Sequence, residues 1–191
     1  MSPVAARERI LHATLELIGE QGIGGVTNRA VATRAGVSLG SLTYHFGSQT
    51  DLLREALLLF VNREARRLEA LAEGLDGTSP PLGEVAEEVM GIIQTAHRHE
   101  LLAQMELYLQ AARDPELREV AARVFAAYDH AAFKMLVALG VPDPGPLVPA
   151  VIALIDGFEL RRLALDVPAA PALAEGLASL VRAGRGGTVS A

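Results

Sequence analysis

The chain has 191 residues, half of them hydrophobic, which is enough for a substantial buried core and argues against a disordered protein. It contains no cysteine, which excludes disulfides, thiolate nucleophiles and cysteine-ligated zinc. The net charge is −6, but eight arginines balance eight carboxylates up to Leu75, so the later residues carry the whole excess. No acidic residue lies between Glu20 and Asp51, as a surface that approaches nucleic-acid phosphates requires.

Neither the N-terminal residues nor the most hydrophobic stretch of the chain predicts a secreted or membrane protein. The first ten residues include Arg7, Glu8 and Arg9 and lack the apolar run of a signal peptide. The most hydrophobic stretch, 147–155, is too short to cross a bilayer and contains Pro149. We therefore expect a cytoplasmic protein with no membrane partner.

Three helices are predicted at the start of the chain. The first has the i, i+4, i+7 apolar spacing of an amphipathic helix, at Leu11, Leu15 and Ile18. Thr27 is placed to cap a short helix over 28–35, which Gly36 would end. Ser38 is placed to cap a second short helix over 39–45. The spacing predicts a helix-turn-helix.

The residues of this motif meet its steric demands. Ala32 offers a small side chain where two helices cross, and four residues later Gly36 can adopt the positive φ that the turn needs. Val37 and Leu42 would anchor the second helix, leaving hydroxyl, imidazole and phenol groups outside for base edges and phosphates. The predicted DNA-binding residues are Thr27, Asn28, Arg29, Ser38, Leu39, Gly40, Ser41, Thr43, Tyr44, His45 and Gln49.

A long helix and a helical body follow. Ser48 and Asp51 have the spacing of a capping box for a connecting helix over 49–71, roughly 35 Å long. After a break rich in glycine and proline at 76–83, helical patterns cover about 84–99, 101–112, 115–139, 147–165 and 172–183. The predicted fold is all-α, with an N-terminal three-helix DNA-binding head at 1–48 and a C-terminal ligand-binding and dimerisation bundle at 49–191.

The head resembles the tetracycline-repressor (TetR) family of bacterial regulators over residues 9–53. The matching positions are Thr27, Val31, Ala32, Ala35, Gly36, Val37, Ser38, Gly40, Leu42, His45, Phe46, Ser48 and Leu52. Two positions differ: Gln49 replaces the family's lysine, and Thr43 replaces its tyrosine. The resemblance implies a homodimer with an effector pocket in its helical body, and a repressor rather than an activator. We expect it to bind a pseudo-palindromic operator in double-stranded DNA, from which a small apolar effector releases it. Arg7, Arg9 and Arg29 are expected to supply the phosphate charge that Gln49 lacks.

Two sets of residues are predicted in the body. Polar or soft residues that interrupt apolar stripes suit a small-molecule pocket: Met90, Gln94, His97, Gln104, Met105, Tyr108, Phe125, Tyr128 and Phe158. The helix over 147–165 is apolar around most of its circumference, so we expect a dimer interface to cover it together with the last helix. The interface residues predicted are Val151, Ile155, Leu163, Leu173, Leu177 and Leu180.

Other readings of the sequence remain open. Residues 36–40 match the G-x-S-x-G nucleophile elbow, but that motif needs a strand-to-helix turn, so we expect Ser38 to be a cap and the chain not to be an enzyme. His97 and His99 would point to different faces of one helix, which argues against metal binding, and their expected place is a helix C-terminus. No cofactor is expected. An all-α enzyme or carrier that uses the body pocket, and a plain helical adaptor, are the alternatives.

Overall fold

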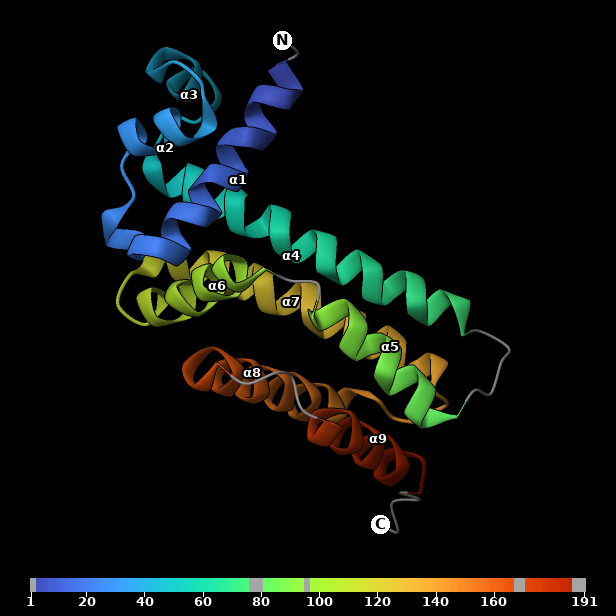
Figure 1. Ribbon diagram of the computed structural model, residues 1–191. Helices are drawn as coiled ribbons and strands as arrows, with labels where there is room; N and C mark the ends of the chain where they lie inside the picture. The colour runs from blue at the N-terminus through green and yellow to red at the C-terminus, as the bar shows by residue number, and fades with distance from the viewer. Residues whose placement is uncertain (1–2, 76–80, 95–96, 167–170, 187–191) are drawn as a thin grey trace. The chain divides into compact units, whose positions relative to one another are not determined.

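The computed structural model describes residues 3–75, 81–94, 97–166 and 171–186, and within these ranges all regular structure is helical (Figure 1). The all-α prediction is confirmed. In chain order the elements are α1 (Pro3–Gln21), the 3-10 turn η1 (Ile23–Gly25), α2 (Asn28–Ala35), α3 (Leu39–His45), α4 (Gln49–Gly74), α5 (Leu82–Gln94), α6 (Arg98–Ala111), α7 (Pro115–Ala138), the 3-10 turn η2 (Gly145–Leu147), α8 (Val148–Leu165) and α9 (Pro171–Gly186).

The chain forms two compact units. Unit 1 comprises Met1–Val61 and His97–Val124, and unit 2 comprises Asn62–Ala96 and Phe125–Ala191. The helices α4 and α7 each run from one unit into the other. The helix α6 belongs to the same unit as the three N-terminal helices, whereas the sequence assigned it to the body. The functional boundary at residue 48 stays a prediction.

In unit 1, α1 is the central helix and packs against both α2 and α6. The apolar face predicted for α1 is buried, with Leu11, Leu15 and Ile18 each at most 1% exposed. The polar Thr14 is also fully buried, and its hydroxyl donates to the carbonyl of Ile10 at 2.8 Å, so no polar group is left unsatisfied there.

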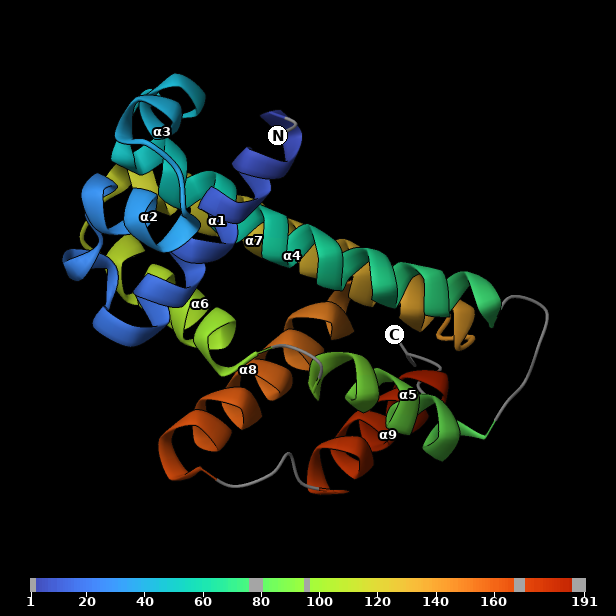
Figure 2. The same ribbon diagram turned by 45° about the horizontal axis from the view of Figure 1, so that its top comes forward.

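The core of unit 2 is formed by one face of each of its helices. In Figure 2, α9 lies beside both α5 and α8, and these helices are in contact. The core includes Val89 and Met90 of α5, Val151 of α8 and Leu173 of α9. Because the apolar residues of α5 and α9 recur on one face, packing the two helices together removes both apolar stripes from water.

Some predicted boundaries are wrong. The helix expected over 84–99 ends at Gln94, and α6 begins at Arg98. His97 is therefore the residue that precedes α6, and Glu100 caps it by accepting from the His97 backbone N–H at 3.0 Å. The two histidines lie at a helix N-terminus rather than a C-terminus. Residues 76–80 of the predicted break lie outside the described residues.

None of the helices in the described part of the chain combines the length and hydrophobicity that a bilayer crossing requires.

Candidate nucleic-acid interface

The helices α2 and α3 begin and end as the sequence predicts. The Thr27 side chain accepts a hydrogen bond from the backbone of Ala30 at 3.2 Å, and the Ser38 side chain accepts one from Ser41 at 3.1 Å. Each cap satisfies one of the backbone N–H groups that a helix start leaves without a partner. Between the two helices, Gly36 has φ 63° and ψ 41°, the left-handed conformation that glycine adopts without strain. The helix-turn-helix geometry is confirmed.

A small core fixes the angle between the two helices. Val31 and Leu42 are at most 1% exposed, and Ala32 and Phe46 are 4% and 5% exposed. Val37, which follows the turn, is half-buried. These five side chains turn inward. Because Leu42 of α3 is among them, the helical period places the neighbouring residues of α3, such as Tyr44, on its opposite face.

That opposite face is exposed. Tyr44 is 85% exposed and Leu39 is 47% exposed, so both present apolar surface to the solvent. Thr43 is exposed and His45 half-buried, with the ring of His45 edge-on to that of Tyr44 at 5.3 Å. The Thr43 hydroxyl lies 3.2 Å from the carbonyl of Leu39, one turn earlier. None of these side chains is enclosed, as recognition of a groove requires.

The remaining predicted DNA-binding residues lie at the surface of the same unit. Exposed residues are Thr27, Arg29, Ser38, Gly40 and Gln49, and half-buried residues are Asn28 and Ser41. Their role in DNA binding stays a prediction.

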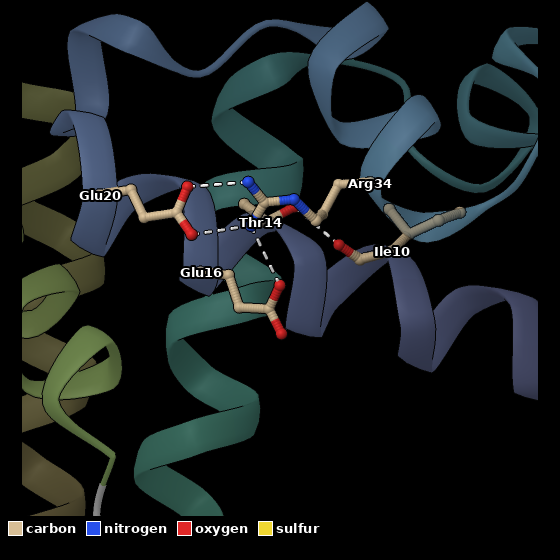
Figure 3. A network of polar contacts seen from close by, with 5 residues as sticks. All are labelled: Ile10, Thr14, Glu16, Glu20 and Arg34. Carbon is tan, nitrogen blue, oxygen red and sulfur yellow. Dashed lines mark hydrogen bonds and ion pairs between the residues drawn. The ribbon is translucent and has the colours of Figure 1, made fainter.

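Arg34, one of two arginines in the stretch free of carboxylates, does not face outward as an unpaired cation. Its guanidinium lies 2.7 Å from one carboxylate oxygen of Glu20 and 3.2 Å from Glu16 (Figure 3). The hydrogen bond from Arg34 lowers the pKa of Glu20, and the same bond raises the pKa of Arg34. Arg34 therefore ties α2 to α1. The sequence alone did not reveal this pairing, because the partners are 14 and 18 residues away.

Arg7 and Gln49, both expected near DNA, also make contacts within the protein. Arg7 forms an ion pair with Glu55, and its guanidinium lies 5.7 Å from the ring centroid of Phe46, so it braces the head internally. The side-chain amide of Gln49 donates to the carbonyl of Val26 at 2.5 Å, joining the start of α4 to the segment before α2. The cap expected from Ser48 is present, since the Asp51 backbone donates to the Ser48 hydroxyl at 3.0 Å, and that hydroxyl in turn donates to the Asp51 carboxylate at 2.9 Å. Arg29 on α2 is exposed, and its role as a phosphate ligand stays a prediction.

The residues predicted to bind a ligand are divided between the units. His97, Gln104, Met105 and Tyr108 lie in unit 1; Met90, Gln94, Phe125, Tyr128 and Phe158 lie in unit 2. The Gln104 amide donates to the Tyr108 hydroxyl at 2.6 Å, and Met90 belongs to the core of unit 2. Their contact with a ligand stays a prediction.

A groove of about 370 Å³ lies in unit 2, between α4 and α5. It is lined by Arg67, Leu71, Glu88, Gly91 and Ile92, none of which the sequence singled out. No pattern pointed to it, because a groove between two helices depends on which of their faces pack together.

The predicted dimer residues fall into two classes. Val151, Leu163, Leu173 and Leu177 are buried within the single chain, and Leu173 has no exposed surface at all. A side chain without exposed surface cannot contact a second copy, so Leu173 serves the core of its own chain. Ile155 and Leu180 are half-buried, and the exposed Leu160 and Leu165 of α8 were not among the six interface residues predicted. The interface itself stays a prediction.

The two histidines before and within α6 lie together instead of pointing apart. Their rings are stacked, with centroids 5.4 Å apart and planes 8° from parallel. Among the described residues, no group of three or more histidines and carboxylates is arranged to hold a metal ion.

Comparison with known proteins agrees with the geometry. Residues 10–56 match the family of bacterial regulatory proteins, tetR family, and residues 80–183 match the tetracyclin repressor-like C-terminal domain. A nicotine-responsive transcriptional repressor of Paenarthrobacter nicotinovorans is 23% identical over 86% of this chain and 87% of its own length.

Solved structures lead to the same family. A TetR-family member from Streptomyces coelicolor has a TM-score of 0.73 at 32% identity, over 92% of this chain and 97% of its own. The multidrug binding protein EbrR in complex with imidazole has a TM-score of 0.67 at 31% identity, over 92% and 93%. EbrR has also been solved with proflavin and with ethidium. The named relatives are regulators or binding proteins, not enzymes. The chain belongs to the TetR family and is a helix-turn-helix DNA-binding transcriptional repressor.

Proposed function

We propose that the protein acts in the cytoplasm as a homodimer on a pseudo-palindromic operator and is released from it by a small organic effector. Residues 1–48 would contact DNA, and residues 49–191 would dimerise and bind the effector. The observation that carries the proposal is the exposed outer face of α3, held by the Gly36 turn and the two side-chain caps.

The proposed contacts divide by chemistry. Ser41, Thr43 and Tyr44 on α3 would reach base edges in the major groove, where hydroxyl groups accept and donate and apolar atoms meet thymine methyls. Arg29 would bind phosphate, since it is exposed and cationic side chains supply the contacts to the DNA backbone. In a dimer, two α3 helices would enter successive major grooves, roughly 34–36 Å apart or somewhat more.

The second copy would cover exposed apolar residues in the C-terminal half of α8 together with part of α9. Leu160 and Leu165 are 55% and 60% exposed, and Ile155 and Leu180 retain partial exposure. Large exposed apolar groups on one helix are typical of an interface. A two-fold axis would bring the same surface of each copy together.

Effector release would operate through α4, which begins in unit 1 and ends in unit 2. A ligand that binds one arrangement of the units more tightly than another shifts the population toward it and so changes the spacing of the two α3 helices. EbrR, solved with imidazole, proflavin and ethidium, supports a small organic molecule as the class of effector.

Selection of bound duplexes from a random DNA pool tests this function. The expected result is a consensus with two inverted half-sites, bound by two copies of the chain. Tyr44→Ala should weaken binding to that consensus without lowering the melting temperature, because the side chain is 85% exposed and packs against little. A selected pool with no two-fold symmetry, or full affinity in the Tyr44→Ala protein, would refute the proposal.

A further inference from the structure

The helix α8 contains a carboxylate that is buried and only half satisfied. Glu159 is 3% exposed, and Arg162 donates to one of its oxygens, Oε2, through Nε at 2.9 Å and Nη2 at 2.6 Å. The other oxygen, Oε1, is inaccessible to solvent and has no hydrogen-bond partner among the described residues. A buried carboxylate oxygen without a donor is unfavourable, so it marks a position where a donor is expected.

A second carboxylate lies one turn earlier on the same side of the helix. Asp156 is half-buried, and the i, i+3 spacing makes it a neighbour of Glu159. Burial, and then the charge of Glu159, raises the pKa of Asp156 to about 6. The two groups are thus close enough to repel each other in poorly solvated surroundings.

The balance of charge at this position is negative. Asp156 and Glu159 contribute two carboxylates, and among the described residues only Arg162 forms an ion pair with them, since Arg161 is exposed on another face. Ile155 and Phe158 of the same helix are partly buried against the core of unit 2. An apolar region with an excess of one negative charge suits a ligand that is hydrophobic and carries one positive charge.

We propose that Glu159 and Asp156 of α8 form the charged part of a binding site for an organic cation, with Glu159 Oε1 accepting a hydrogen bond from the ligand. This inference rests on the proposed effector-binding role and specifies its chemical class: an aromatic or aliphatic amine that is protonated at neutral pH, which narrows the small apolar effector expected from the sequence. Arg162 acts as a positioning residue, because it holds Oε2 and so directs Oε1 away from itself.

The test uses the full chain without DNA and two dyes of the same ring system, proflavin as the cation and acridine, which is largely uncharged at about pH 7.5. Dye binding is followed by fluorescence anisotropy. Proflavin should bind the parent protein more tightly than acridine. Glu159→Gln should weaken proflavin about 10- to 100-fold, the range for a hydrogen bond to a charged group, and leave acridine unchanged. Asp156→Asn should act in the same direction with a smaller effect.

The controls separate the rival sites. Glu175→Gln on α9 changes an exposed carboxylate that pairs with Arg182, and should leave proflavin binding unchanged. Glu88→Gln changes the carboxylate at the groove between α4 and α5. If Glu88→Gln abolishes proflavin binding and Glu159→Gln does not, the cation site is that groove and the proposal is overturned.

Two further outcomes are informative. Equal affinity for proflavin and acridine in the parent protein would overturn the proposal. So would a Glu159→Gln protein that keeps its dye affinity but dissociates into single copies on sedimentation, because the donor for Oε1 would then belong to the second copy. Thermal unfolding of each variant verifies that it folds. If Glu159→Gln does not fold, Asp156→Asn provides the test of proflavin binding. Operator release is measured separately, so the cation site can stand even if release fails.

Discussion

The close contact between α1 and α6 provides the sharpest prediction for stability. A Cβ atom built on Gly19 would lie 2.5 Å from both Cα and Cβ of His99 and 2.7 Å from its carbonyl oxygen. Ordinary contacts of a Cβ begin at 3.4 Å, so Gly19→Ala requires the two helices to separate by about 0.9 Å, the difference between 3.4 and 2.5. Two of the three contacts are with backbone atoms, so a side-chain rotation cannot relieve them.

The size of the effect follows from two opposing terms. Overpacking of a close contact costs about 1–3 kcal/mol, and replacing glycine by alanine within a helix gains about 1 kcal/mol. The matched control is Gly40→Ala in α3 of the same unit, where the new Cβ meets only Ser38 Oγ at 3.9 Å, an ordinary contact. The control receives the helix gain without the clash, so the two variants should differ by about 1–3 kcal/mol.

Thermal unfolding followed by circular dichroism measures that difference. Gly19→Ala should melt below Gly40→Ala, by roughly 2–4 °C for each kcal/mol in a chain of this size. The displaced α6 should also increase hydrogen exchange at the end of α1, whereas Gly40→Ala leaves α1 unaffected. If Gly19→Ala melts at or above the control, the contact between α1 and α6 is looser than the geometry requires and the reasoning fails.

Three other predictions concern single side chains. Gly36→Ala should lose about 1–2 kcal/mol because φ 63° places a Cβ against the next carbonyl, and Gly36→Asn should lose less in the same denaturant titration. Arg29→Ala should reduce the slope of log affinity against log salt concentration by about 0.9 on every duplex, whereas the control Arg66→Ala on α4 should leave that slope unchanged. If Arg29→Ala also leaves the slope unchanged, Arg29 is not a phosphate ligand. The pKa of Asp156 is raised from 3.8 to about 6. The contribution of this group to the free energy of unfolding is therefore fully present below pH 3.8 and is lost as the pH rises through about 6. Asp156→Asn should therefore raise the melting temperature more at about pH 7.5 than at about pH 4, and an equal gain at both would contradict the shift.

The segment over α2 and α3 was predictable because its determinants are local. Thr27 caps a backbone group three residues away, Ser38 does the same, and Gly36 adopts its conformation for reasons confined to its own residue. The apolar period then determines which side chains turn inward, so the exposure of Tyr44 follows from the burial of Leu42.

The boundary between α5 and α6 shows where local reasoning was insufficient. Residues 84–99 have a continuous helical pattern, yet α5 ends at Gln94 and His97 starts a new helix with Glu100 as its capping partner. A capping box and a continued helix use the same residue types, and the choice between them depends on what each helix packs against. That information lies elsewhere in the chain.

The sequence by itself determined the all-helical class, the capped helix-turn-helix and the residues on its outer face, because each depends on interactions within a few residues. Tertiary structure alone decided that Arg34 pairs with Glu16 and Glu20, that α6 packs on Gly19, and that Glu159 is buried with one oxygen unsatisfied. Those features depend on which distant segments meet, and the free energy of a charge depends on everything that surrounds it.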